Sequence, residues 1–267
     1  GMRELGLNSA DFEQLLFFKV TRLLIIKRCF DIDADKWAKL YITNIINLAS
    51  SYSTNNQLTE AIELEQEALV ICKALYLESK ATWVELYTIS LNNLASSYRK
   101  NNQLAEVIEL EQEALAIRKV LYLENKTMWG EHYATSLSNL ASSYSKNNQL
   151  TEAIELTQEA LSIRKTLYLD NKITWAEQYA ISLNNLAMSY YQNKQMTEAI
   201  EFQQEALVIC KALYLENKTV CVELYTTNLN NLALSYKKTN QLSKAIELEQ
   251  EALSIRKTLY LDNKITW

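Results

Sequence analysis

The sequence contains few residues of the kinds that catalyse reactions or bind metals. His132 is the only histidine, and no set of cysteine, aspartate or further histidine residues accompanies it. The serines of the recurring Ala-Ser-Ser-Tyr segments lack a Gly-x-Ser-x-Gly context, and that one histidine is the only imidazole base in the chain. Three glycines are too few for a glycine-rich phosphate loop. We therefore predict no catalytic residue, no metal site, no cofactor and no enzymatic activity, and we expect His132 at the surface.

Asparagine is the residue whose spacing points most clearly to a function. One asparagine recurs every 46 residues, and a second precedes it in three of the five copies. Asparagine has mediocre helix propensity, so its repeated use inside a helix needs compensation. Its amide both donates and accepts hydrogen bonds, which is the chemistry that holds the backbone of an extended peptide. The two sets are Asn47, Asn93, Asn139, Asn185 and Asn231, and Asn92, Asn184 and Asn230.

Duplication offers an alternative explanation for these asparagines. The segment QEALSIRKTLYLDNKITW occurs twice, beginning at Gln158 and at Gln250, so the asparagines could have been copied with everything else. Each could also bond within its own helix or to its neighbour. Positions that differ between copies are therefore more informative about a ligand. Two such positions are occupied by Ser53, Arg99, Ser145, Tyr191 and Lys237, and by Ser50, Ser96, Ser142, Met188 and Leu234.

Basic residues gather beside the first of these variable positions. Arg99, Lys100, Lys146 and Lys237 would give a ligand groove a basic edge, although the chain as a whole carries a net charge of −5. This pattern predicts an acidic peptide or a free carboxylate as ligand. Alternatively, the lysines only complement the dipole at the C-terminal end of a helix.

Two helices in each 46-residue repeat must position these side chains. Trp83, Tyr87, Leu91, Leu94 and Tyr98 are spaced three or four residues apart, which places them on one face of a helix that we name A. A second set with helical spacing spans 61–75 and defines helix B, which we expect to be roughly 20 residues or about 30 Å long. Neither helix can bury its apolar face alone, so neighbouring repeats must stack.

The ends of these helices are also marked in the sequence. Asparagine tolerates the left-handed backbone that ends a helix, and it stands at the expected A-to-B turn in four repeats, with Lys194 as the exception. Thr82-x-x-Glu85 and its copy at 174–177 match the capping box that begins a helix. The glutamates of each IELEQEAL segment, such as Glu63, Glu65 and Glu67, are expected on a solvated helix face.

The order of small and aromatic residues, Leu91-x-x-Leu94-Ala95-x-x-Tyr98 followed by Val107 and Ala114, resembles the tetratricopeptide repeat, most of all the longer kinesin-light-chain type. The resemblance covers about residues 40 to 267. It implies an all-α, right-handed superhelical solenoid of stacked antiparallel helix hairpins, with helix A lining a concave groove where the asparagine before the Leu-Ala pair contacts peptide. Two family features are absent. The proline that closes the repeat is missing, and the aromatic residue in the middle of helix B is replaced by Glu65, Glu111, Thr157, Gln203 or Glu249.

The resemblance predicts a non-enzymatic scaffold that binds a protein or an extended peptide. We expect about eleven helices, with residues 1–36 forming an N-terminal capping helix, a degenerate half repeat whose helix lies at 10–30. Residues 37–267 would form five tandem repeats, the last ending at the start of a sixth. No polar helix would then cover the last helix B, which predicts a possible homodimer through that face. The alternative function is a structural spacer or an oligomerisation segment of a larger repeat protein.

Composition narrows the partners and the location. An acidic chain lacks the basic field that nucleic acid binding exploits, so no nucleic acid partner is expected. No apolar run approaches the roughly 18 to 20 residues that cross a bilayer, so no membrane partner is expected. The four cysteines form no Cys-x-x-Cys pair, which indicates reduced thiols and a cytoplasmic protein.

Overall fold

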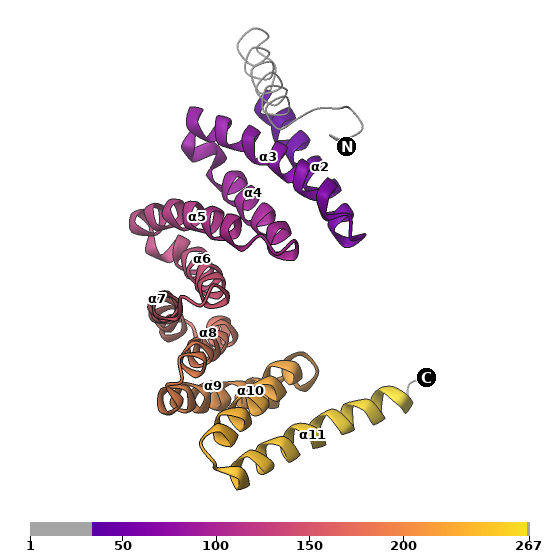
Figure 1. Ribbon diagram of the computed structural model, residues 1–267, viewed down its shortest axis with the longest axis vertical. Coiled ribbons are helices and arrows are strands. Elements are labelled where there is room, and N and C mark those ends of the chain that lie inside the picture. The colour runs from indigo at the N-terminus through magenta and orange to yellow at the C-terminus, as the bar shows by residue number, and fades with distance from the viewer. Residues whose placement is uncertain (1–33, 266–267) are drawn as a thin grey trace. The chain divides into compact units, whose positions relative to one another are not determined.

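A computed structural model describes residues 34–265, and ten α-helices with short turns account for nearly all of them (Figure 1). No strand occurs among these described residues. The predicted all-α class is therefore confirmed. The expected helix at 10–30 and the boundary at 36/37 lie outside or at the edge of this range and stay predictions. The helices are α2 (Ala34–Thr54), α3 (Leu58–Glu78), α4 (Lys80–Lys100), α5 (Leu104–Glu124), α6 (Lys126–Lys146), α7 (Leu150–Asp170), α8 (Lys172–Gln192), α9 (Met196–Glu216), α10 (Lys218–Lys238) and α11 (Leu242–Ile265).

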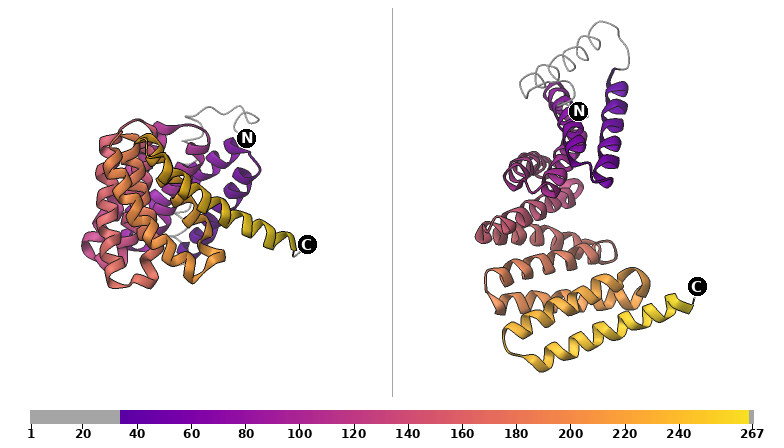
Figure 2. Two further views of the ribbon diagram at one scale, coloured as in Figure 1. Left: turned by 90° about the horizontal axis from the view of Figure 1, so that it is seen from below. Right: turned by 45° about the vertical axis from the view of Figure 1, so that its right-hand side comes forward.

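The even-numbered helices are the predicted A helices and the odd-numbered ones are the B helices. Helices α2 to α10 are each 21 residues long, which confirms the extended helix B. Consecutive helices run antiparallel, as Figure 2 shows for α6 to α11. The hairpin is thus the structural unit, as the repeat requires.

The chain divides into two compact units, one ending at Ile117 and the other beginning at Arg118, so that the division falls within α5. In the first unit, Trp83, Tyr87 and Leu91 of α4 are buried against residues of α3 such as Ile71 and Leu75. In the second unit the equivalent residues of α8 and α10 form the cores, among them Tyr179, Leu183, Tyr225 and Leu229. The apolar face predicted for helix A is therefore the buried face.

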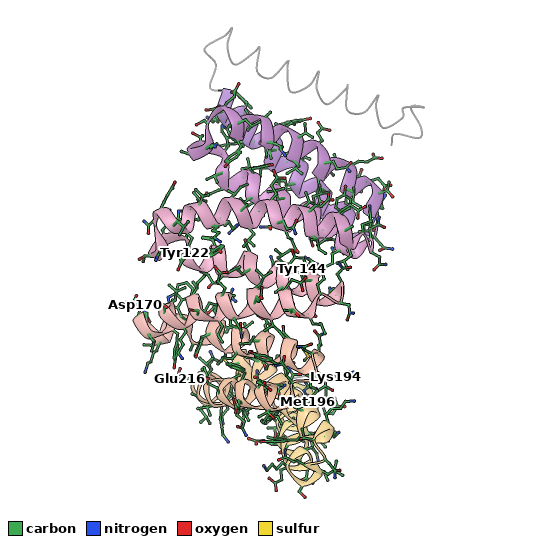
Figure 3. All side chains as sticks on the ribbon, turned by 60° about the vertical axis from the view of Figure 1, so that its left-hand side comes forward. Tyr122, Tyr144, Asp170, Lys194, Met196 and Glu216 are labelled. Atoms are coloured by element: carbon green, nitrogen blue, oxygen red, sulfur yellow. The ribbon has the colours of Figure 1, made fainter. Side chains whose placement is uncertain are left out.

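Every A-to-B turn uses one residue with a left-handed backbone. Asn56 has a φ angle of 61°, and Lys194, the exception in the sequence, adopts 62°. In Figure 3 the α8–α9 turn at Lys194 lies at one edge of the second unit, and the B-to-A junctions after Asp170 and Glu216 lie at the opposite edge. The predicted turn positions are confirmed at Asn56, Asn102, Asn148, Lys194 and Asn240.

The predicted starts of the A helices were wrong by two residues. Helix α8 begins at Lys172 instead of Thr174, and the side chain of Asn171 accepts a hydrogen bond from the Thr174 backbone N–H at 3.1 Å. Asn125 caps α6 in the same way, through Met128. The asparagine that was expected to close helix B is therefore the N-cap of the next helix A, because its side chain can bond the free N–H groups there.

Two series of polar contacts join neighbouring helices. A tyrosine of each helix A donates to a glutamate of the following helix B, 26 residues later, as Tyr179 does to Glu205 at 2.6 Å. A glutamine of helix B donates to a tyrosine of the next helix A, 32 residues later, as Gln158 does to Tyr190 at 2.7 Å. Burial, and then the bond to Glu67, raise the pKa of Tyr41 to about 12, so this hydroxyl stays protonated at neutral pH. Such contacts fix how consecutive helices pack.

Candidate functional site

A pocket of about 290 Å³ lies between the A helices α2 and α4, with Glu65 of α3 among its lining residues. We name it the α2–α4 pocket. It contains the asparagine of each A helix, hydroxyl groups from both, and one lysine. Its lining residues are Ile46, Asn47, Ser50, Ser53, Thr54, Glu65, Asn93, Ser96, Ser97 and Lys100.

A second pocket, of about 340 Å³, occupies the corresponding place between α6 and α8, with Thr157 of α7 among its lining residues. We name it the α6–α8 pocket. Almost every lining position is the same repeat position as in the first pocket, so each unit presents a version of one site. Its lining residues are Ser138, Asn139, Ala141, Ser142, Ser145, Thr157, Asn185, Met188, Ser189 and Gln192.

The predicted asparagines of these pockets have free amide groups. Asn47 and Asn185 are exposed, and Asn93 and Asn139 are half-buried. Within the described range, none of the predicted asparagines, the two sets taken together, forms a side-chain hydrogen bond to another protein group. The alternative that each asparagine bonds within its own helix or to its neighbour is therefore not what the structure shows. Four of the amides are instead available at the two pockets.

Glu65 corrects an expectation from the sequence. The glutamates of helix B were predicted on a solvated face, but Glu65 is 5% exposed and Glu111 is 3% exposed. Burial raises the pKa of Glu65 to about 7, although a hydrogen bond from Ser97 and the charge of Lys100 act in the opposite direction. Its Oε2 atom is buried and has no hydrogen-bond partner. The signal was in the sequence, because Glu65 stands where the family pattern has an interior aromatic residue.

The position of Glu65 is neutral in the α6–α8 pocket. The hydroxyl of Thr157 donates to backbone carbonyls of its own helix, at 2.7 Å to Ala153 and 3.0 Å to Ile154. Met188 replaces the serine found at its position in the first three A helices. The two pockets therefore share a backbone and an asparagine pair but differ in charge and polarity.

Models of the tetratricopeptide repeat match most of the sequence. One model matches residues 178–258, and another matches 45–78, 89–125 and 134–171. The chain belongs to the tetratricopeptide repeat family. No curated protein matches the sequence as a whole.

Solved structures agree with this family. Nearly identical TPR-like repeats of a kinesin light chain from Podosopora anserina are 25% identical, with a TM-score of 0.66 over 82% of this chain and 96% of theirs. BtubC (BKLC) from P. vanneervenii has a TM-score of 0.69 at 22% identity, over 93% of this chain and 92% of its own. MamA has a TM-score of 0.51 at 15% identity, over 79% and 96%. The kinesin-light-chain-like repeat type is thus confirmed.

The predicted basic edge of these tetratricopeptide repeats is partly neutralised. The Arg99 guanidinium forms an ion pair with buried Glu111, and Lys237 pairs with Glu249 at 2.5 Å. Lys146 is exposed, and no ion pair joins it to another described residue. Of the basic residues predicted for the site, only Lys100 lines a pocket, and Tyr191 lines neither. The structure therefore assembles the asparagines but not the full set of cations.

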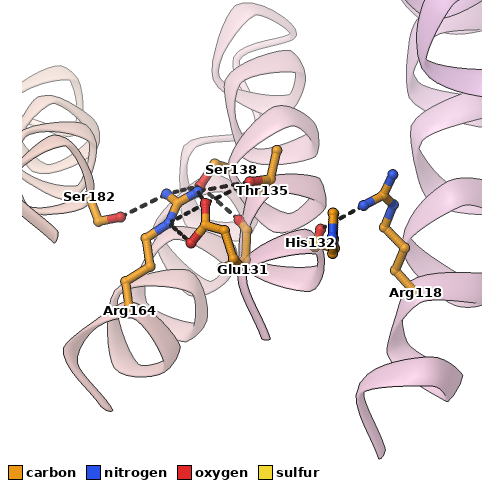
Figure 4. Close-up of polar contacts among 8 residues, drawn as sticks. Arg118, Glu131, His132, Thr135, Ser138, Arg164 and Ser182 are labelled. Atoms are coloured by element: carbon orange, nitrogen blue, oxygen red, sulfur yellow. Dashed lines mark hydrogen bonds and ion pairs between the residues drawn. The ribbon is translucent and has the colours of Figure 1, made fainter. Parts of the chain in front are cut away.

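A buried arginine that the sequence did not single out connects three helices of the second unit (Figure 4). Arg164 of α7 is 6% exposed, and its Nη2 atom donates to Glu131 Oε1 at 2.7 Å. It also donates to Ser182 of α8 at 2.8 Å, to Thr135 at 3.0 Å and to Ser138 at 3.3 Å. Such complete bonding indicates a structural role.

The remaining candidates for chemistry lie apart from the pockets. His132 is exposed as predicted, and its backbone carbonyl accepts from Arg118 at 3.3 Å. Burial raises the pKa of the Cys72 thiol to about 11 and that of Cys210 to about 12. Among the described residues, no group of metal-ligating side chains is close enough to hold an ion, and no helix is long and apolar enough to cross a membrane.

Proposed function

We propose that the chain binds extended segments of partner proteins on its A helices, at the α2–α4 and α6–α8 pockets. Tetratricopeptide repeats generally form protein-interaction scaffolds, and the unbonded asparagine amides at both pockets are the observation that supports this location. An extended peptide has backbone N–H and C=O groups without partners, and each amide can meet one of each. The pockets are at the lower end of the size range of ligand sites, which suits single side chains of such a peptide.

The test is a pull-down from the lysate of the source cell with a triple variant, Asn93→Ala, Asn139→Ala and Asn185→Ala. We expect partners of the wild-type chain to be lost, because each substitution removes an amide from a pocket without creating a void in the core. The matched control carries Ser162→Ala, Thr166→Ala and Thr258→Ala, all exposed on B helices. Circular dichroism must show that both variants are folded. Retention of the same partners by the asparagine variant would place binding elsewhere.

An acidic ligand is a finer part of this proposal. Since Arg99 and Lys237 are already paired with glutamates, the preference depends on Lys100 and Lys146. Exposed charges separated by a Debye length or more are screened by salt. Binding of an identified partner should therefore weaken at 0.5 M NaCl and in a Lys100→Gln, Lys146→Gln variant. Unchanged affinity in both experiments would exclude the acidic preference.

Association through α11 is a second candidate function. Leu242, Ile246 and Leu253 of this helix are 53%, 52% and 67% exposed, whereas Ile62 and Ile154, which occupy the same repeat position as Ile246, are 9% exposed. A copy of the chain that packs on this stripe would form a homodimer or act as a spacer. Light scattering across concentrations should then show a dimer that Ile246→Lys and Leu253→Lys together abolish. A monomer at all concentrations would remove this candidate.

The proposed setting is the cytoplasm. Cys72, Cys210 and Cys221 are all unpaired, as expected where thiols are kept reduced. Microscopy of the tagged chain in the source cell tests this location directly.

A further inference from the structure

Each helix A residue at the variable position of Arg99 faces a helix B residue 12 positions later. Arg99 pairs with Glu111 and Lys237 with Glu249 in this way. In the other repeats the same two positions hold Ser145 with Thr157 and Tyr191 with Gln203, neither of which contains a charge. A glutamate at the second position is thus matched by a cation at the first in these two repeats.

The first repeat breaks this rule. Glu65 is the buried glutamate, but the residue 12 positions before it is Ser53. The serine is too short to reach as arginine does and carries no charge. One carboxylate oxygen of Glu65 therefore has no hydrogen-bond partner.

Lys100 is the only cation that lines the α2–α4 pocket, and it does not fill the missing place. Its Nζ atom donates to Ser53 Oγ at 2.7 Å. Within residues 34–265 no ion pair joins Lys100 to Glu65. A buried carboxylate is costly unless it is paired and hydrogen-bonded, so a cation that reached it would be held firmly.

We propose that the α2–α4 pocket receives an arginine or lysine side chain of the bound peptide, which pairs with Glu65 as Arg99 pairs with Glu111. This inference rests on the proposed function, since the same peptide backbone would bond Asn47 and Asn93. The side chain enters between the hydroxyl groups of Ser50, Ser53 and Ser96 and displaces Lys100 from Ser53. The α6–α8 pocket has Thr157 in place of the carboxylate and does not select a cation.

The test uses two capped pentapeptides, acetyl-Gly-Ser-Arg-Ser-Gly-amide and the same peptide with neutral, isosteric citrulline. Binding to the full chain is followed by NMR through the backbone amide signals of Ser53, Ser97 and Lys100. We expect the arginine peptide to bind at least about fivefold more tightly than the citrulline peptide. The preference should disappear in Glu65→Gln, which keeps the shape of the side chain.

A gain-of-pairing variant provides the sharper control. Ser53→Arg supplies from within the chain the cation that Arg99 supplies in the next repeat, so it should fold normally and also lose the preference. Ser145→Arg, the same change at the other pocket, should leave the preference intact. Persistence of the preference in both Glu65→Gln and Ser53→Arg would overturn the cation site.

The outcomes also separate this inference from the proposed function. Equal binding of the two peptides, reduced by Asn47→Ala and Asn93→Ala together, would overturn the cation site and keep peptide binding by the asparagines. If neither peptide shifts any signal of the pocket at millimolar concentration, both proposals for this unit fail.

Discussion

The two units bury a charged side chain in different ways. In the second unit Arg164 is enclosed by Glu131 and three hydroxyl groups from α6 and α8. In the first unit Glu65 is buried to a similar extent, but one oxygen has no partner and the carboxylate lines a pocket. Arg164 thus has its partners inside the fold, whereas Glu65 lacks one.

The helices that carry these residues are copies of one another, so the difference is a matter of side chains alone. Two repeats earlier, Cys72 stands at the position of Arg164 and contacts Ser90 Oγ at 3.2 Å. Two repeats later, Thr157 stands at the position of Glu65. A fully bonded interior charge adds to the structure of the solenoid, and an incompletely bonded one beside a pocket is a candidate for recognition.

The largest expected effect comes from removing the paired charge. Arg164→Ala should lower the free energy of unfolding of the second unit by about 3 kcal/mol, because it leaves Glu131 and the surrounding hydroxyls without their donor. Urea unfolding monitored by circular dichroism measures this change. Arg256 at the same repeat position is the control, since its side chain is 50% exposed and lies 3.8 Å from Glu223. Arg256→Ala should cost at most about 0.5 kcal/mol, and equal losses would refute the comparison.

Glu65→Gln should act in the opposite direction and depend on pH. The folded pKa of Glu65, about 7, is above its ordinary value of 4.5. The protonated form therefore favours folding below pH 4.5, and this contribution is lost as pH rises through 7. Relative to wild type, the variant should gain about 1–2 kcal/mol between pH 4.5 and pH 8.5.

Urea unfolding at both pH values tests this second effect. Glu249→Gln is the matched control, because Glu249 is paired with Lys237 and its side chain is 43% exposed. A pH-independent difference between Glu65→Gln and wild type would show that Glu65 is not protonated on burial.

A smaller gain is expected at Gly130, which stands in α6 where the first unit has Val84. A methyl group added there would meet Ile163 and Leu167 at 3.6 to 3.8 Å, which is ordinary contact. Gly130→Ala should stabilise the second unit by up to about 1 kcal/mol, because glycine is the less favourable helix residue. A lower melting temperature than wild type would show that this contact is too tight.

The smallest effect should come from the turn at Lys194. Its φ angle of 62° matches that of Asn56 in the first unit, but lysine adopts this conformation less readily. Lys194→Asn should raise stability by about 0.5 kcal/mol, measured by thermal unfolding, and Asn56→Lys should lower it by a similar amount. Changes of the same sign in the two variants would contradict this view of the turn.

The sequence by itself determined the helices and their order. The recurrence of Leu, Ala and Tyr at three and four residue spacing predicts an A helix, and the asparagines at 56, 102, 148 and 240 predict the left-handed turns, because both depend on local backbone preferences. The shared pattern also placed Asn47 with Asn93, and Asn139 with Asn185, at equivalent positions. Even the errors in the helix starts were local, since Asn125 and Asn171 can serve either helix end.

Only the tertiary structure decided the fate of the charges. Glu65 and Glu63 are indistinguishable by composition and differ by two positions, yet one is buried and the other is half-buried. Whether Arg99 is free for a ligand depends on Glu111, which belongs to another helix. Burial and pairing are set by side chains brought together from different helices, and a spacing rule within one helix does not contain that information.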